Sequence, residues 1–249
     1  MEPAAIDAET VARIRPSRRH RKPQSRISDD IHAAYVAHEL RTPLATQHVL
    51  LELALADSNT DAAAWRAVGE DVLRACRQQE RLLEACLTLA RSKGGLQRCE
   101  PLDLAVVTAE ALRAHDQRGL ESVISLDSAW ISGEPELLER LVANLVSNAI
   151  RHNTADGLIE VATRGKQGRA VLAIANTGPL IPACDVIHLF HPFRRLNSNP
   201  HAFGDGVGLG LTIVQAIANA HGAHIVPRAR RGGGLDIQVS FRATRVRRT

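Results

Sequence analysis

A histidine beside a carboxylate is the first pair in this sequence that could do chemistry. His38 and Glu39 open the octapeptide HELRTPLA at residues 38–45. Glu39 can take the ring proton of His38, so that an imidazole nitrogen can attack an electrophile such as a phosphorus atom. Pro43 follows five residues later, where its ring and its missing N–H predict a bend in a helix. Because an isolated His-Glu pair is more often an ordinary pair on a helix surface, this hypothesis depends on the motifs that follow.

The segment NLVSNAIRH at residues 144–152 carries the second set of polar residues. Helical spacing puts Asn144, Asn148, Arg151 and His152 within two turns on one side of a helix, while the apolar residues between them point to a core. Amide oxygens suit a Mg²⁺ ion that is shared with a triphosphate, because this ion keeps few protein ligands when phosphates supply the rest. Arg151 can offset phosphate charge. Taken alone, the asparagines would more often be hydrogen-bonding residues of a helix surface.

Two glycine-containing segments complete the set. In IANTGPLIP at residues 174–182, a predicted strand ends at Asn176, which can face the edge of a base, and Gly178 allows the backbone to approach it closely. GDGVGLGL at residues 204–211 then opens a helix, and free N–H groups at such an N-terminus favour phosphates. It lacks the context of the dinucleotide fingerprint and is weak evidence alone. Its candidate residues are Gly206, Gly208, Gly210 and Leu211.

Two long helices must position the histidine. Apolar residues that recur every three and four positions predict helices at about 27–57 and 62–92, joined by a turn at 58–61. One hairpin cannot cover its own apolar stripes, so we expect two hairpins to pair in a four-helix bundle. The alternative is a hairpin that packs only on its own C-terminal domain. The predicted stripes include Thr42, Ala45, Val49 and Leu53 in the first helix and Trp65, Val72, Leu82 and Leu89 in the second.

The rest of the chain has a mixed pattern. Helices are predicted near residues 102–117, 134–151 and 206–220, strands near 122–126, 158–163, 170–175 and 235–241, and an irregular stretch at 177–205. This order predicts an α+β sandwich, in which helices cover one face of a mixed sheet.

Composition limits the class of protein. The 249 residues are 45% hydrophobic and 23% charged, as in soluble globular proteins. No run approaches 18 apolar residues and no apolar signal core is present, so we expect a cytoplasmic chain. The four cysteines form no C-x-x-C pair and predict no zinc or disulfide framework.

The net charge of +4 is concentrated in residues 1–28, which hold seven basic and three acidic residues. We interpret this arm first as a solvated, disordered leader. The alternatives, in order, are the flank of a membrane segment absent from this chain and a contact with anionic lipid or nucleic acid.

Together and in this order, the motifs resemble those of the sensor histidine kinases of two-component signalling, over about residues 28–243. The combination is highly specific. The resemblance assigns residues 38–44 to the phospho-acceptor box, 144–152 to the N box, 176–182 to the G1 box, 190–193 to the F box and 206–211 to the G2 box.

The resemblance implies ATP and Mg²⁺ as cofactors. It makes His38 the phosphorylated residue, Glu39 its general base and Asn148 the Mg²⁺ ligand, and it places residues 183–205 in a mobile lid over ATP. Thr42 occupies the position that in this family orients water for dephosphorylation of the partner. It also implies a homodimer, a response regulator receiver domain as partner, and association with a membrane or sensor region that is missing or separate from this chain.

Two positions depart from the family pattern. Asn176 stands where most members have an aspartate that holds the adenine amino group, and Leu180 stands where they have a second glycine. An amide oxygen can still accept from the adenine N–H, but without charge assistance worth about 1 kcal/mol. Asn176→Asp is therefore expected to tighten nucleotide binding about fivefold. Leu180 would be strained if its backbone needs a positive φ.

The sequence thus predicts a helical hairpin that forms a dimeric four-helix bundle, followed by an α+β sandwich of the histidine kinase and Hsp90-like type. The expected divisions are a basic leader at 1–27, a dimerisation and phosphotransfer domain at 28–95, an ATP-binding catalytic domain at 96–243 and a basic tail at 244–249. The expected activity is autophosphorylation of His38 from Mg·ATP, followed by transfer to an aspartate of a response regulator. The alternative is a kinase-impaired phosphatase or scaffold with a degenerate ATP site.

Overall fold

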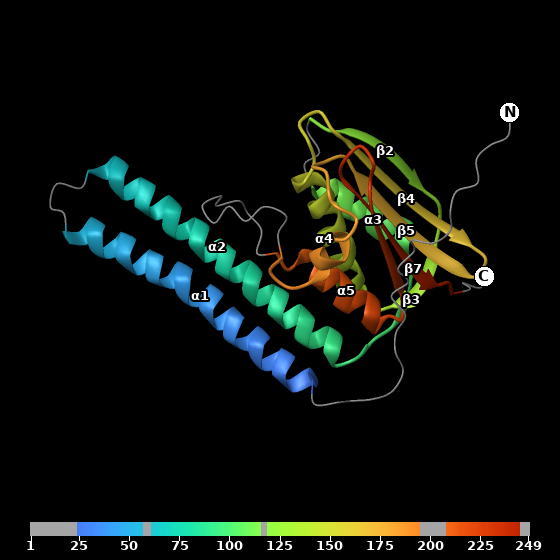
Figure 1. The fold of residues 1–249 in the computed structure, drawn as a ribbon, viewed down its shortest axis with the longest axis horizontal. Helices are drawn as coiled ribbons and strands as arrows, with labels where there is room; N and C mark the ends of the chain where they lie inside the picture. The colour runs from blue at the N-terminus through green and yellow to red at the C-terminus, as the bar shows by residue number, and fades with distance from the viewer. Residues whose placement is uncertain (1–23, 57–60, 116–118, 195–207, 245–249) are drawn as a thin grey trace.

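A helical hairpin and a two-layer α/β domain make up the protein (Figure 1). The computed structural model describes residues 24–56, 61–115, 119–194 and 208–244, and for residues 24–39 it describes the backbone but not the side chains. None of the helices in these ranges combines the length and the apolarity that crossing a membrane requires.

The hairpin consists of α1 (Gln24–Ala56) and α2 (Ala62–Lys93). The Asp61 side chain caps α2 by accepting a 2.8 Å hydrogen bond from the N–H of Ala64, and the N–H of Gly94 closes the other end on the Ala90 and Arg91 carbonyls. Helix α1 continues through Pro43. Both helices were predicted to within three residues of their ends.

The face of α1 that packs against α2 is not the predicted stripe. Gln47 and Ala54 are buried, whereas Val49 and Leu53 of the predicted stripe are 52% and 64% exposed. The Gln47 side chain donates to Oε1 of Gln79 at 3.3 Å, and Gln79 donates to the Leu40 carbonyl at 3.3 Å. Leu40, Pro43, Gln47, Leu50 and Ala54 are accordingly the shielded positions. The apolar stripe read from the sequence lies on the open side of the hairpin.

Five strands form the main sheet in the order β2-β4-β5-β7-β6, with β2 parallel to β4 and every other pair antiparallel. Their bounds are β2 (Glu121–Leu126), β4 (Leu158–Lys166), β5 (Arg169–Asn176), β6 (His224–Ala229) and β7 (Leu235–Arg242). A separate pair joins β1 (Glu100–Asp103) to β3 (Trp130–Gly133). Strands β1, β3 and β6 are short and were not predicted from the sequence.

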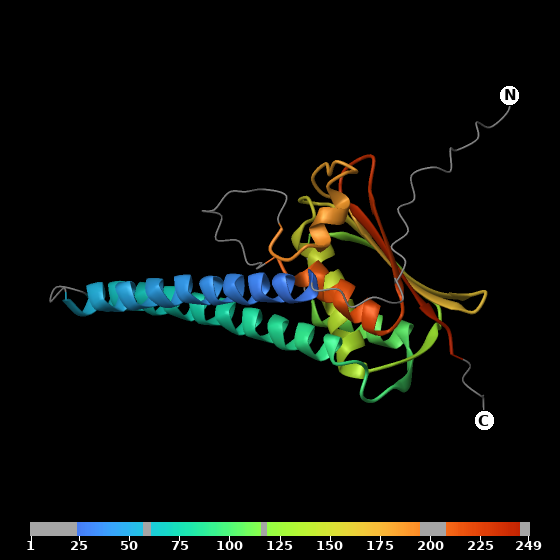
Figure 2. The same cartoon turned by 60° about the horizontal axis from the view of Figure 1, so that its bottom comes forward.

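Three helices cover one face of the sheet (Figure 2). They are α3 (Leu104–Ala114), α4 (Pro135–Arg151) and α5 (Gly210–Ala220). Alternate residues of β4, β5 and β7 are buried against them, as expected for a sheet with one covered face. The predicted α+β sandwich is confirmed, and it has its own apolar core. Leu104, Leu138, Leu141, Ile159, Leu172, Ile217 and Phe241 are fully buried there.

The C-terminal half of α2 packs on this domain. Leu82 is 2% exposed and belongs to the same buried cluster as residues of α4 and α5. Arg140 of α4 pairs with Glu84, and Arg91 pairs with Glu134 and Glu136. Leu82 is therefore covered within its own chain. The sequence had placed it on the apolar stripe that a second hairpin was expected to cover.

Candidate active site

Helix α4 carries the predicted N box. Pro135 begins the helix, where its missing N–H costs no hydrogen bond, and the leucines of its inner face fix its orientation on the sheet. Asn144 donates from Nδ2 to the Arg140 carbonyl at 2.8 Å. Its Oδ1 lies 3.2 Å from the point where a Cβ on Gly210 would stand. The N box helix thus contacts the first residue of α5.

Helix α5 begins without a side-chain cap. Its first intrahelical bond runs from the N–H of Ile213 to the Leu209 carbonyl, and Leu209 has no side chain that could accept from the first turn. The backbone N–H groups of Gly210, Leu211 and Thr212 have no hydrogen-bond partner among the described residues. Such an end attracts anions, because the N–H groups and the helix dipole both favour negative charge. The Leu211 side chain is buried, so that residue would act through its N–H.

Residues 183–194, the first part of the predicted lid, are described, and so is Gly208, which follows the lid. The N–H of Phe193 donates to the Gly208 carbonyl at 3.0 Å, and Gly208 has a φ of +71° with Phe193 Cα 3.1 Å from the position of a Cβ. A 3₁₀ turn at Val186–Phe190 is held to α5 by the Thr212 hydroxyl, which donates to the Phe190 carbonyl at 3.2 Å. Gly206 and the rest of 195–207 lie outside the described residues.

The predicted G1 segment follows β5. Asn176 is 4% exposed, and its Nδ2 donates to the Thr177 carbonyl at 2.6 Å and to the His152 carbonyl at 3.5 Å. A Cβ on Gly178 would stand 2.5 Å from that same His152 oxygen, so only glycine fits there. The end of the N box and the start of G1 are therefore in direct contact.

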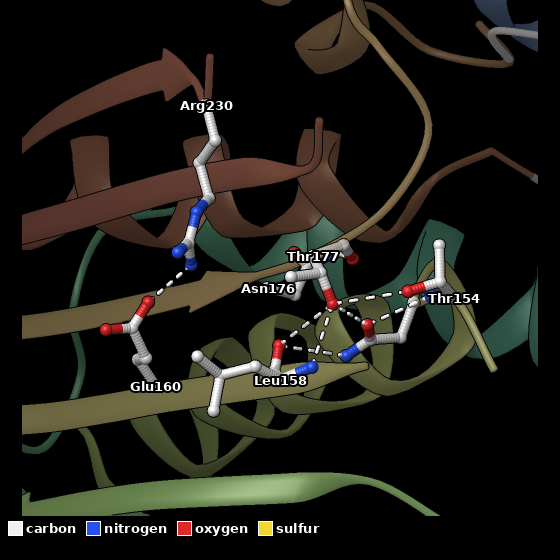
Figure 3. Close-up of polar contacts among 7 residues, drawn as sticks. Thr154, Leu158, Glu160, Asn176, Thr177 and Arg230 are labelled. Carbon is white, nitrogen blue, oxygen red and sulfur yellow. Dashed lines mark hydrogen bonds and ion pairs between the residues drawn. The ribbon is translucent and has the colours of Figure 1, made fainter. Parts of the chain in front are cut away.

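A polar cluster that sequence reasoning missed supports this corner (Figure 3). The Thr177 hydroxyl lies 2.5 Å from Oδ1 of Asn153 and accepts from the N–H of Leu158 at 2.8 Å. Asn153 donates in turn to the Leu158 carbonyl at 3.2 Å. A Cβ on Gly157 would stand 2.1 Å from Asn153 Oδ1. The signals in the sequence were the Asn-Thr pair that follows the N box and the glycine before β4.

A second glycine turn packs on the same corner. The N–H of Gly234 donates to the Pro179 carbonyl at 2.9 Å, and its φ of +94° allows it to sit directly over the backbone of Asn176. Leu180, by contrast, is 76% exposed and is not among the described residues with positive φ. The strain considered for Leu180 is therefore absent.

A shallow cavity of about 330 Å³ lies on the other face of the sheet. Its walls include Glu160, which pairs with Arg230 (Figure 3), and Asp236. Burial raises the pKa of Asp236, and the nearby Arg228 and Arg230 oppose that shift. This cavity contains none of the predicted site residues and does not adjoin α4 or α5, so it is not the active site.

The phospho-acceptor segment lies in the hairpin. His38 and Glu39 have a described helical backbone in α1, while their side chains lie outside the described part. Thr42, one helical turn after His38, is exposed. Arg151 and His152 are exposed at the end of α4.

The residues present fit a magnesium nucleotide. No group of three His, Cys, Asp or Glu side chains suitable for a metal exists among the described residues. The Asn148 side chain is half-buried and forms no hydrogen bond with any described residue, so its amide oxygen is available. One such oxygen suffices for a Mg²⁺ ion whose other ligands are phosphates and water. The uncapped start of α5 offers the complementary donors for the phosphates.

Two family models match this chain. The "His Kinase A (phospho-acceptor) domain" matches residues 31–95, and the "Histidine kinase-, DNA gyrase B-, and HSP90-like ATPase" matches residues 133–245. Sensor protein CutS of Streptomyces coelicolor is 42% identical over 210 residues, which are 82% of this chain and 50% of CutS. The chain thus spans about half the length of this relative.

Solved structures share the fold. The histidine kinase AdeS of Acinetobacter baumannii aligns with a TM-score of 0.65 at 23% identity, over 84% of this chain and 98% of AdeS. The histidine kinase ThkA, solved in complex with the response regulator protein TrrA, aligns with a TM-score of 0.63 at 18% identity, over 90% of this chain and 65% of that one. The two matched families, in this order, and the CutS relationship show that the chain belongs to the sensor histidine kinases.

Proposed function

We propose that this chain autophosphorylates His38 from Mg·ATP and passes the phosphoryl group to an aspartate of a response regulator. One observation carries the proposal. Helix α4 contacts Gly210 through Asn144, and His152, the residue that follows the helix, contacts Asn176 and Gly178 through its carbonyl. Motifs separated by some 60 residues in sequence therefore surround one site, beside the hairpin that carries the histidine.

The residues divide the work of binding by their chemistry. Asn148 provides the amide oxygen for Mg²⁺, the N–H groups at Gly210 and Leu211 donate to phosphate, and Asn176 faces the base. Asn144, Arg151, His152, Gly178, Gly206 and Gly208 complete the proposed nucleotide site. Bound Mg·ATP supplies the phosphoryl group, and the metal neutralises charge that develops during transfer.

The phospho-acceptor box supplies the nucleophile. A ring nitrogen of His38 would form the bond to the γ-phosphorus of ATP as the bond from that phosphorus to the β–γ bridging oxygen breaks and ADP leaves, while Glu39 takes the ring proton. Thr42 lies one turn away on exposed helix, where its hydroxyl can orient a water molecule for removal of phosphate from the regulator. Thr42→Ala should therefore keep autophosphorylation and slow that dephosphorylation.

The open face of the hairpin supports a homodimer. Val49, Leu53, Leu55, Leu73 and Leu87 are between 52% and 73% exposed in the single chain. Soluble monomers rarely leave so many large apolar side chains uncovered, and a second hairpin would cover part of them in a four-helix bundle. We divide the chain accordingly into dimerisation and phosphotransfer residues 28–95 and catalytic residues 96–243.

The phosphatase or scaffold alternative finds no specific support. It depended on Asn176 and Leu180, and Leu180 is an unstrained surface residue.

Incubation of the purified chain with γ-labelled ATP tests the proposal. A phosphohistidine loses its label in acid and keeps it in alkali, and His38→Ala should carry none. His48→Ala is the matched control, because His48 is an exposed histidine of the same helix that also faces a carboxylate, Glu52 at 3.7 Å. Equal labelling of His38→Ala and the parent chain would refute the assignment.

A further inference from the structure

We propose that Gln79 of α2 is a positioning residue for phosphoryl transfer, because its amide bridges the two parts of α1 that Pro43 separates. Through this bridge, α2 fixes the direction of the helical turn on which His38 stands. The inference rests on the proposed function of His38, and it assigns a role to a residue outside the phospho-acceptor box and the nucleotide motifs.

Pro43 removes a backbone hydrogen bond from the middle of α1. A proline has no N–H to donate to the carbonyl four residues earlier, and its ring crowds the preceding turn, so a helix bends most easily there. The turn with His38 and Glu39 lies before Pro43, and the rest of α1 continues to Ala56. The direction of that turn therefore depends on contacts from outside α1.

One side chain of α2 contacts α1 on both sides of the proline. Gln79 Nε2 donates to the Leu40 carbonyl at 3.3 Å, and Gln79 Oε1 accepts from Gln47 Nε2 at 3.3 Å. Leu40 precedes Pro43 and is two residues beyond His38, whereas Gln47 is one turn after the proline. The bridge therefore ties the segment that carries the histidine to the segment that follows the proline.

These hydrogen bonds can run in only one direction. The Leu40 carbonyl can only accept, so the end of the Gln79 amide that faces it must be the NH₂ group. The oxygen of Gln79 then faces Gln47, whose amide must offer its own NH₂ group. Turning either amide over would bring two acceptors together with no proton between them. The bridge thus has one favoured geometry.

Burial strengthens the bridge at its far end. Gln47 is 8% exposed, and Gln79 and Leu40 are half-buried. The Nε2 atom of Gln47 also lies 3.5 Å from Sγ of Cys76, which is a weak acceptor. Because water cannot readily replace Gln79 as the partner of a buried amide, loss of the bridge is costly.

Helix α2 connects this bridge to the nucleotide-binding domain. Leu82, one turn after Gln79, is buried in the domain core together with Ala85. The same stretch of α2 therefore contacts the acceptor turn of α1 and the domain that holds the nucleotide. Phosphoryl transfer requires the attacking nitrogen of His38 to be in line with the bond that breaks, so a change of direction at Pro43 should slow it.

Labelling of the full chain over a series of γ-labelled ATP concentrations separates positioning from binding. Gln79→Met keeps the length of the side chain and removes both bridging bonds. We expect the rate constant at saturating ATP to fall about tenfold. The ATP concentration for half-maximal rate, and the calorimetric Kd of the β,γ-imido analogue of ATP, should stay within about twofold of the parent values.

Gln78→Met is the matched control, because Gln78 is the adjacent residue of α2 and its amide is exposed. It should keep the parental rate. A parental rate in Gln79→Met, or an equal loss in Gln78→Met, would overturn the inference.

A double variant distinguishes positioning from stability. Combining Gln47→Met with Gln79→Met replaces both amides by apolar side chains of similar shape, so no buried amide is left unpaired and the hairpin should be as stable as in the parent chain. Thermal unfolding and light scattering check the fold and the assembly. A positioning role predicts that the double variant stays about tenfold slow. A double variant with the parental rate would show that Gln79 acts only through stability.

These outcomes are distinct from failure of the proposed function. If the parent chain and Gln79→Met label His38 equally fast, the bridge is refuted and the kinase proposal stands. If the parent chain carries no label on His38, the kinase proposal fails, and hydrogen exchange tests the bridge by itself. Gln79→Met should speed exchange of the backbone amides of residues 40–47 about threefold or more, and unchanged exchange there would refute the bridge.

Discussion

The hairpin and the α/β domain differ in how they cover their apolar residues. In the domain, Leu104, Leu138 and Leu141 are fully buried by elements of the same chain. In the hairpin, Leu53, Leu55 and Leu87 are 64%, 73% and 65% exposed, and a glutamine pair occupies the space between the helices. The domain buries its apolar core within one chain, whereas the hairpin leaves large apolar side chains exposed.

This difference separates the two roles. A nucleotide site needs fixed donors and acceptors, and a complete core holds α4, α5 and β5 in register around Asn176 and Gly210. The hairpin carries the proposed acceptor histidine on α1, and in the proposed dimer a second chain would cover the exposed apolar side chains of that helix. The two regions meet where Leu82 and Ala85 of α2 enter the domain core.

The most severe test removes each role separately. His38→Ala and Asn148→Ala should each abolish autophosphorylation, the first by loss of the nucleophile and the second by loss of the metal ligand. His38→Ala should still bind the ATP analogue in calorimetry. Asn219→Ala, which removes an exposed amide of α5, is the control and should retain activity. A mixture of the two inactive variants becomes labelled if the phosphoryl group passes from ATP on one subunit to His38 of the other. Full activity of Asn148→Ala would exclude the proposed role of Asn148 as a metal ligand.

Core truncation should distinguish the regions by stability. Leu141→Ala should lower the free energy of unfolding by about 2–5 kcal/mol, because it leaves a cavity in a complete core. Leu55→Ala truncates a side chain that is 73% exposed. It should change the free energy of unfolding of the monomer by about 0.5 kcal/mol or less. Urea unfolding at low protein concentration measures both. Similar losses would show that the hairpin is not the less covered region.

Dimerisation should be sensitive to substitutions in the hairpin and insensitive to substitutions in the domain. Light scattering should give twice the chain mass of 27.0 kDa at micromolar concentration. Leu53→Asp should shift this towards the monomer, because it places a charge on the open face of α1. Val123→Asp is the control, since Val123 is 54% exposed but lies on the domain sheet. A monomeric parent chain, or an unaffected Leu53→Asp dimer, would contradict the bundle.

The smallest expected effect is on pH dependence, and it belongs to the domain. Burial lowers the pKa of His221, while the Ile217 carbonyl and the Glu134 charge oppose this shift. Its Nε2 accepts from the N–H of Glu134 at 3.1 Å, so the folded protein favours neutral histidine. The unfolded chain then binds more protons, and stability should fall as pH drops below about 6.5, the ordinary histidine pKa.

His221→Gln should remove that part of the dependence between pH 7 and 5, as measured by thermal unfolding. An identical slope in His221→Gln and the parent chain would show that His221 does not contribute.

Some features of the protein could be read from local sequence. The two hairpin helices and the strands flanking the N and G1 boxes were predicted because their periodicity and capping residues, such as Asp61 and Gly94, act within a few positions. The motif order was sufficient to indicate the family. The short strands β1, β3 and β6 were missed, since four to six residues form a strand only when partners from distant sequence pair with them.

Tertiary structure decided which surfaces and atoms those motifs present. An apolar stripe cannot reveal whether α2 or a second molecule covers it, and α1 turned its Gln47 and Ala54 face inward. The Leu82 side chain is buried in the core of the domain and not in a helical bundle, because α2 packs against α5. The orientation of the Asn176 amide depends on the carbonyls of His152 and Thr177, which the fold brings to the same point. Sequence determined the chemical groups available, and long-range packing determined which atoms of those groups remain free.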